Sequence, residues 1–209
     1  MSNGWWPWAA LVLLGAYHGV NPGMGWLFAV ARGLQEQKRQ AVLSSLLPIA
    51  LGHEASIIIV VITVSLTEQF MPTYLVRLLA ALVLVSFGVY TLARPRWHAK
   101  GFGMRVGFKG LAGWSFLMSS AHGAGLMLAP VLLGMNVAGT YHSLSEITMQ
   151  AVFAASLHVT AMLLVMGIIS IVVYEKVGLR VLRRGWFNMD LAWSLVLITS
   201  GAITLFTAL

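Results

Sequence analysis

Six long apolar segments, separated by short connections, constrain this chain more than any other feature. A membrane-spanning helix needs about 20 mainly apolar residues. The 209 residues are 59% hydrophobic and only 9% charged, whereas soluble domains are about one-quarter charged. We therefore predict an all-α membrane protein in which residues 1–209 form a single six-span domain. The predicted spans are Trp8–Ala31, Ala41–Leu66, Thr73–Ala93, Gly110–Gly134, Glu146–Tyr174 and Met189–Ala208.

Positive charge is concentrated in alternate connections, which predicts the orientation of the chain. The net charge is +7, and every Lys and Arg except Arg77, which lies just inside the third span, follows the first, third or fifth span. Cytoplasmic loops rich in Lys and Arg, alternating with outer loops that lack these residues, are typical of membrane proteins. The pattern favours a multi-pass protein of a bacterial-type cytoplasmic (inner) membrane with both termini outside, and it argues against nucleic acid as a partner. The clustered residues are Arg32, Lys38, Arg39, Arg94, Arg96, Lys100, Arg105, Lys109, Lys176, Arg180, Arg183 and Arg184.

The two halves of the sequence resemble each other. LVLVSFGVYTL (residues 82–92) aligns with LVLITSGAITL (residues 195–205), and six of these eleven positions are identical. A repeat of three spans has an odd number of crossings, so the second copy must be inverted relative to the first. We predict repeat A at about residues 8–93 and repeat B at about residues 110–208, an architecture that is common in transporters and holds the substrate between the repeats.

Four histidines lie near the middle of four different spans. His18 and His122 stand in corresponding first spans of the repeats, and His53 and His158 in corresponding second spans. Each lies about 10–12 residues into its span, a depth of roughly 15–18 Å and half of the apolar core. Ionisable side chains inside a membrane mark ion or proton paths, and neutral imidazole binds Zn, Cu, Fe and Ni. The pattern predicts a four-histidine metal site at the midplane, whereas His98 and His142 are assigned to loops.

The first span contains Asn21–Pro22 in the stretch GAYHGVNPGMGW, which predicts a broken helix. Proline lacks an amide hydrogen and clashes with the preceding turn, and asparagine followed by proline is a good helix start. The fourth span repeats the His-Gly pair at His122 without the Asn-Pro, so we expect a softer break there. Asn21, Pro22, Met24 and Met162 are the predicted lining of the substrate pathway, although methionine is also ordinary apolar packing.

Glu54 is the one carboxylate near the middle of a span. A buried carboxyl group is protonated when it is alone and ionises beside a cation, which suits a proton-coupling residue. The alternative is a neutral hydrogen bond between helices.

The stretch HGVNPGMGW resembles the His-Gly-x-x-Pro-Gly signature of the nickel/cobalt efflux branch of the LysE superfamily. The resemblance implies export of a divalent cation or small solute through a midplane site that includes His18, Asn21, Pro22 and Gly23. This chain has Met24 where the branch tends to place another histidine, so the ion stays open among nickel, cobalt, zinc and copper.

Together these features predict a proton-coupled secondary transporter for a transition-metal ion rather than an enzyme. Two alternatives remain open: a proton-coupled exporter of a small organic or anionic solute, and a membrane oxidoreductase with bis-histidine haem. The expected partners are the lipid bilayer and the transported metal ion or solute, and a homodimer is left open. The chain has no cysteine, which excludes thiolate ligands and dithiol exchange.

Overall fold

The computed structural model describes residues 5–93, 107–134, 144–177, 189–206 and 208, and these residues form helices and no strand. The predicted loop residues His98 and His142, and the basic residues of 94–105 and 180–184, lie outside the described residues. The elements are α1 (Trp6–Val20), η1 (Pro22–Met24), α2 (Trp26–Glu36), α3 (Arg39–Phe70), α4 (Thr73–Ala93), α5 (Phe108–Ala121), α6 (Ala124–Gly134), α8 (Leu144–Val172), η2 (Val173–Val177) and α9 (Met189–Phe206).

Three described helical stretches are long and apolar enough to cross a membrane. They are Arg39–Phe70, Thr73–Ala93 and Thr148–Lys176, and a shorter apolar stretch covers Ser194–Phe206. The predicted first and fourth spans are each divided into two shorter helices. A membrane protein is therefore supported by three continuous helices, and the other predicted spans are interrupted or shorter.

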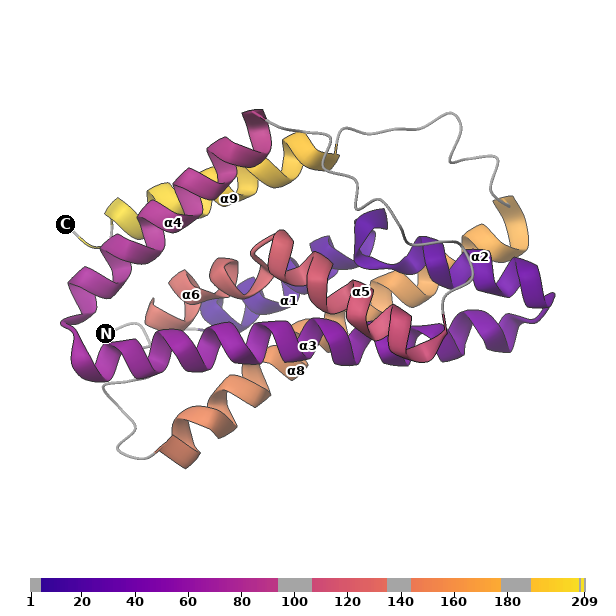
Figure 1. The fold of residues 1–209 in the computed structure, drawn as a ribbon, viewed down its shortest axis with the longest axis horizontal. Coiled ribbons are helices and arrows are strands. Elements are labelled where there is room, and N and C mark those ends of the chain that lie inside the picture. The colour runs from indigo at the N-terminus through magenta and orange to yellow at the C-terminus, as the bar shows by residue number, and fades with distance from the viewer. Residues whose placement is uncertain (1–4, 94–106, 135–143, 178–188, 207, 209) are drawn as a thin grey trace.

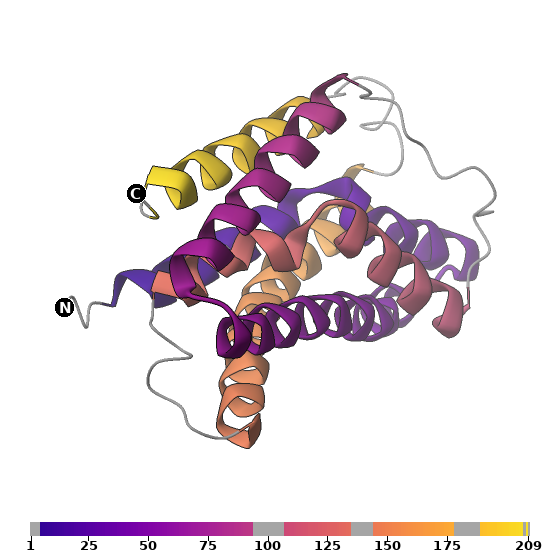
Figure 2. The same cartoon turned by 60° about the vertical axis from the view of Figure 1, so that its left-hand side comes forward.

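The helices are arranged as three closely packed pairs (Figures 1 and 2): α1 with α8, α3 with α5, and α4 with α9. The α4/α9 pair lies along one edge of the molecule, while the other two pairs form the larger body. This pair is antiparallel, because the hydroxyl groups of Thr91 and Ser194 share a hydrogen bond of 2.9 Å while Val85 lies against Gly201. Helix α6 contacts both α4 and α9 and joins them to the body.

The α3/α5 pair is parallel. The hydroxyl of Ser115 donates to the carbonyl oxygen of Ile49 at 2.7 Å, and further along both helices the hydroxyl groups of Ser56 and Ser120 lie 2.9 Å apart. Since residue numbers rise together on both helices, the start of α5 lies beside the start of α3. These hydrogen bonds join two apolar helices where no water competes.

Hydroxyl groups on the apolar helices bond to their own backbone. Thr63, Thr160 and Thr199 each donate to the carbonyl oxygen four residues earlier, at 2.7–2.8 Å. All three side chains are exposed on the isolated chain. This local bond satisfies the hydroxyl without solvent, as a lipid-facing position requires.

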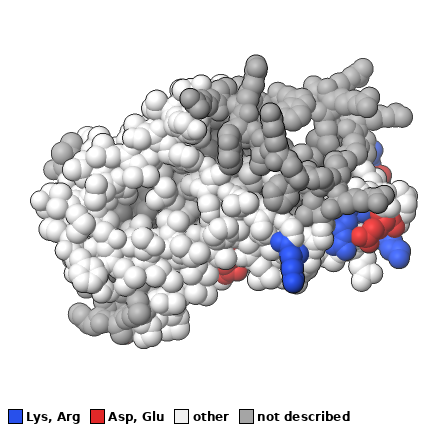
Figure 3. Space-filling view, in the orientation of Figure 1, with Lys and Arg blue, Asp and Glu red and all other residues white. Residues whose placement is uncertain are grey.

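On the face shown in Figure 3 the described surface is largely apolar; the blue Lys and Arg atoms lie toward one end, and a small acidic patch lies nearer the middle. Near the turn between α2 and α3, ion pairs join Arg32 to Glu36 at 2.7 Å and Arg39 to Glu175 at 3.4 Å. Between the ends, large apolar side chains are exposed on several helices. Examples are Leu13, Leu47, Leu51, Ile59, Phe153, Leu164, Ile168 and Ile203.

Candidate metal centre

The first predicted span is broken where the Asn-Pro pair stands. Helix α1 ends at Val20, and the side-chain oxygen of Asn21 accepts a hydrogen bond from the Gly23 amide at 2.9 Å. Pro22 begins a short 3₁₀ turn, and α2 begins only at Trp26, after Gly25 with φ 123°. The expected break is present, but the α-helix does not resume at Pro22 as the sequence suggested.

The break has its own hydrogen bonds. The indole nitrogen of Trp26 donates to the carbonyl oxygen of Val20 at 3.1 Å, and the Asn21 amide donates to the carbonyl of His18, also at 3.1 Å. Such partners are needed because unpaired backbone groups at a helix end are costly inside a membrane. The interruption is thus held in one conformation.

The predicted fourth span is broken more briefly. Helix α5 ends at Ala121, His122 and Gly123 form the connection, and α6 begins at Ala124. Gly123 has φ 68°, the left-handed region that glycine adopts without strain. The shorter interruption agrees with the absence of an Asn-Pro pair.

Small residues bring α1 onto α8. A methyl group at Gly15 would collide with the carbonyl oxygen of His158, and one at Gly19 would lie 2.5 Å from that of Met162. The glycine spacing therefore permits close helix contact of the small-xxx-small kind. As a result, His18, between these glycines, lies at the same level as His158.

Three histidines from three helices meet in the core. His18 of α1, His53 of α3 and His158 of α8 are fully buried, at 0% exposure. Their ring centroids are 4.8 Å apart for His18 and His158, 5.3 Å for His18 and His53, and 5.8 Å for His53 and His158. Each offers one ring nitrogen, and these nitrogens all lie within 4.8 Å of one another.

Backbone carbonyls fix the proton on two of these rings. His18 Nδ1 lies 2.6 Å from the carbonyl oxygen of Leu14, and His158 Nδ1 lies 3.1 Å from that of Leu11. A carbonyl oxygen only accepts hydrogen bonds, so each neutral ring carries its proton on Nδ1. The lone pair is then on Nε2, the arrangement by which proteins prepare a histidine ligand for metal.

Three ring nitrogens of His53 and His158 are buried without a hydrogen-bond partner in the described part of the chain. Among the described residues, neither ring nitrogen of His53 nor Nε2 of His158 has a hydrogen-bond partner. Leaving a buried polar atom unsatisfied costs about 1–3 kcal/mol. A bound cation would be coordinated by the lone pair of His158 Nε2 and by the one ring nitrogen of His53 that carries no proton. This is a physical reason to regard the cluster as a ligand site.

The donor set fits a borderline transition-metal ion. Metal–imidazole distances are about 2.0–2.1 Å, which places ligand nitrogens about 3.3–3.4 Å apart in a tetrahedral site. Nitrogens within 4.8 Å need only a small inward movement to reach that geometry. Three imidazoles leave a fourth position for water or another ligand, as in open zinc sites.

The remaining predicted site residues are placed as follows. His122 does not belong to the group of three; its Nδ1 lies 2.7 Å from the carbonyl oxygen of Met118. Met24 and Met162 are buried. Asn21 is buried too and caps the 3₁₀ turn that Pro22 begins.

Glu54 also lies outside the three-histidine group. Its carboxylate accepts a hydrogen bond of 2.6 Å from the hydroxyl of Ser156 on α8. Ser156 stands two residues before His158, so this bond ties α3 to α8 beside two of the clustered histidines. Sequence reasoning missed Ser156, because an isolated serine in an apolar span carries no signal of its partner.

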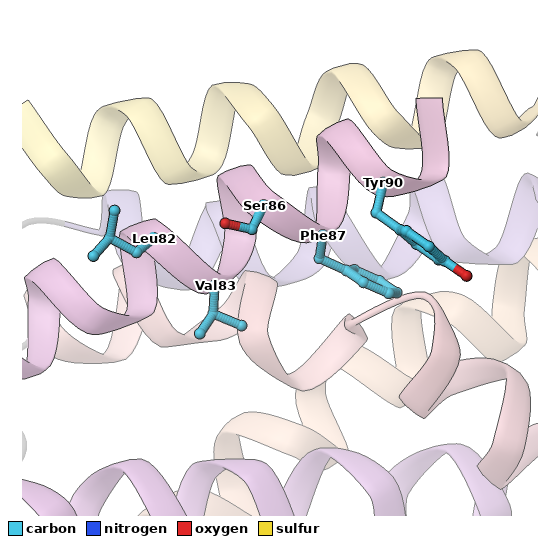
Figure 4. Close-up of a pocket in the computed structure, with 5 residues that line it drawn as sticks. All are labelled: Leu82, Val83, Ser86, Phe87 and Tyr90. Carbon is cyan, nitrogen blue, oxygen red and sulfur yellow. The ribbon is translucent and has the colours of Figure 1, made fainter. Parts of the chain in front are cut away.

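One shallow hollow lies apart from the histidines, along α4 (Figure 4). Its lining is mainly apolar and includes none of the predicted site residues: Leu82, Val83, Ser86, Phe87 and Tyr90. We assign it no part in the metal centre.

Comparison with known proteins adds no relative: no family model, curated protein or solved structure matches this chain. The histidine cluster and the fold are therefore the features that bear on function.

Proposed function

We propose that this chain is a secondary membrane transporter that exports a divalent transition-metal cation through its midplane histidines. The observation that carries the proposal is the buried group of His18, His53 and His158, with ring nitrogens within 4.8 Å and two rings held with Nε2 available. Such a group inside a membrane protein is costly unless it has a ligand to hold. Metal binding requires neutral imidazoles, so affinity should fall as the pH is lowered.

The six-span inverted repeat is supported by reciprocal contacts in the α4/α9 pair. Gly88 and Gly201 are equivalent in the sequence alignment, as are Val85 and Ile198. A methyl group at Gly88 would lie 2.7 Å from the side chain of Ile198, and one at Gly201 would lie 2.7 Å from that of Val85. Gly88 thus meets the residue equivalent to Val85, and Val85 meets the residue equivalent to Gly88. Reciprocal contacts of this kind follow from a two-fold axis. Because the helices are antiparallel, such an axis would lie in the membrane plane.

The other two pairs follow the same rule. Helix α1 packs on α8, and its counterpart α5 packs on α3, the counterpart of α8. The break in the first span and the break in the fourth span are also counterparts. We infer that repeat A spans about residues 8–93 and repeat B about residues 110–208.

The charges support an orientation with both termini outside the cytoplasm. Arg32 and Arg39 lie near the turn that joins α2 to α3, at one end of the molecule (Figure 1), and Arg39 pairs with Glu175. Lys109 belongs to the same end, since α5 begins beside the start of α3. The start of α1 and the end of α9 lie at the opposite end (Figure 1). A basic end on the cytoplasmic side of an inner membrane accounts for this arrangement.

The stretch HGVNPGMGW supports membership of the nickel/cobalt efflux branch of the LysE superfamily, because it lies at the break and contributes His18 to the cluster. Glu54 is the residue we assign to proton coupling: it is held by Ser156 next to the histidines and could exchange a proton as the site loads and unloads. The ion remains one of nickel, cobalt, zinc and copper.

The alternatives have less support. An anion held by the Asn21–Pro22 turn would need free amides, but the Gly23 amide is already bonded to the Asn21 side chain. A bis-histidine haem needs a flat slot between two rings, whereas here a third imidazole fills the space beside the other two. Export of a small organic solute is the second candidate function, and it is supported by the general helical architecture alone.

Metal binding by the purified protein tests the proposal. We expect the wild type to bind one of the four ions with a stoichiometry near one per chain. His53→Ala and His158→Ala should lower that affinity by at least about 100-fold, more than the loss of an outer-shell partner. His98→Ala is the matched control and should bind as the wild type does. Metal-free wild type, or equal binding in all variants, would refute the metal proposal, and a Soret band would favour haem.

A further inference from the structure

We propose that the four histidines bind the ion three at a time. His53 and His158 are permanent ligands, while His18 and His122 serve in turn as the third ligand when the transporter alternates between its two open sides. This inference rests on the proposed function. It differs from a four-ligand site, in which all rings would hold the ion together.

The permanent pair is defined by symmetry and by geometry. His53 and His158 occupy equivalent positions in the two halves. Their rings are parallel, with an interplanar angle of 5° and centroids 5.8 Å apart. Parallel planes are one arrangement that a two-fold axis between two rings can produce. A ligand pair on that axis stays equally available whichever repeat changes its conformation.

His18 and His122, the exchanging pair, have the same local hydrogen bond but differ in their position relative to the cluster. His18 Nδ1 lies 2.6 Å from the carbonyl of Leu14, four residues earlier, and His122 Nδ1 lies 2.7 Å from that of Met118, also four residues earlier. Both rings therefore hold their proton on Nδ1 and present Nε2 as a donor to metal. Only His18 is inside the group of three.

The end of α5 that carries His122 nevertheless lies beside the helix that carries His53. Ser120, two residues before His122, shares a hydrogen bond of 2.9 Å with Ser56, three residues after His53. His122 is held at the end of α5 beside a break, where a small change of backbone angles would turn the ring. The break contains Gly123 at φ 68°, and the corresponding break in the other half contains Gly25 at φ 123°. Residues at the ends of elements absorb the backbone changes of hinge motions.

If the two repeats alternate in conformation, the equivalent histidines His18 and His122 are expected to differ in whether they join the cluster. In an inverted-repeat transporter, one repeat moves against the other around a fixed midplane site. A conformation in which repeat A supplies the third ligand then has a counterpart in which repeat B supplies it. Exchange of the third ligand would move the ion from one half to the other while two ligands keep hold of it.

Cobalt(II) alone is a suitable probe, because the chain has no cysteine to compete for the ion. We would measure Co(II) affinity in nanodiscs and Co(II) flux in proteoliposomes for five variants: His18→Ala, His122→Ala, the double variant, His53→Ala and the control His98→Ala. Size-exclusion profiles and circular dichroism would monitor folding. His122→Gln keeps side-chain bulk and serves as the second variant if His122→Ala is unstable.

The expected result is a split between binding and flux. Each single change, His18→Ala or His122→Ala, should lower affinity by less than about tenfold and abolish flux, because one state keeps three ligands and the other does not. The double variant should lose affinity by at least about 100-fold, as His53→Ala does. Wild-type flux in the His122 variants would overturn the inference, as would a loss of affinity in His18→Ala equal to that in His53→Ala. Failure of wild-type protein to bind any of the four metals would instead refute the proposed function.

Discussion

The two interrupted helices carry equivalent histidines, yet they use them differently. The first interruption runs from Asn21 to Gly25 and is closed by side-chain hydrogen bonds, and its histidine is buried in the cluster. The second is only the pair His122–Gly123, and its histidine lies outside the group of three. Sequence equivalence therefore fixes the local geometry of these rings, whereas the packing of each half-helix decides which ring reaches the shared site.

Helix α1 reaches the site because glycine removes the side chain that would separate it from α8. The sharpest test of this difference is Gly15→Ala, where the added methyl meets the carbonyl oxygen of His158. Overpacking of this kind costs about 1–3 kcal/mol, and metal affinity should fall because His158 is displaced. Gly113→Ala on α5 is the matched control, since nothing lies within 4 Å of its added methyl.

We would measure unfolding in denaturant and metal affinity for both glycine variants. Gly113→Ala should be neutral or more stable by up to about 1 kcal/mol, as expected for glycine replaced inside a helix. Equal stability of the two variants would show that close contact between α1 and α8 does not position the histidines.

Substitutions at the two breaks should have smaller effects on stability, and these effects should differ between the breaks. Asn21→Ala removes the oxygen that accepts from the Gly23 amide, and loss of such a cap costs about 0.5–2 kcal/mol. Gly123→Ala acts on the second break through its left-handed backbone, at a cost of about 1 kcal/mol. Asn21→Ala should also weaken metal binding, because the first break positions His18, whereas Gly123→Ala should leave binding unchanged and slow transport. Thermal unfolding with and without metal would measure stability and binding for both variants, and Co(II) flux in proteoliposomes would measure transport. Identical effects of the two changes on metal binding would contradict the distinction between the breaks.

Much of this arrangement follows from local sequence features. Proline after asparagine predicts the first break, and Thr73–Ala93 is a helix with the predicted bounds. These properties depend on a few adjacent residues. Three of the four mid-span histidines stand on helices that meet.

Other features depend on residues far apart in the chain and could not be predicted. The carbonyl of Leu11 that orients His158, and the Ser156 hydroxyl that holds Glu54, come from other helices. Nothing in the sequence distinguishes His18 from His122 as the buried ring. That difference depends on how each half-helix packs against its neighbours, which the local sequence around the two histidines does not specify.

The smallest expected effect concerns the indole bond that closes the first break. Trp26→Phe keeps an aromatic ring and removes the hydrogen bond to the carbonyl of Val20, which should cost about 0.5–1.5 kcal/mol. Because Trp26 begins α2 and Val20 ends α1, the bond should matter mainly for the position of α2 relative to α1. We expect a modest loss of thermal stability with little change in metal affinity, because His18 precedes the bond and keeps its own link to Leu14. Trp8→Phe, which keeps its contact with Phe153, is the control for loss of an indole elsewhere on the molecule. A large loss of metal affinity in Trp26→Phe alone would mean that the break, rather than the α1/α8 contact, holds His18 in the cluster.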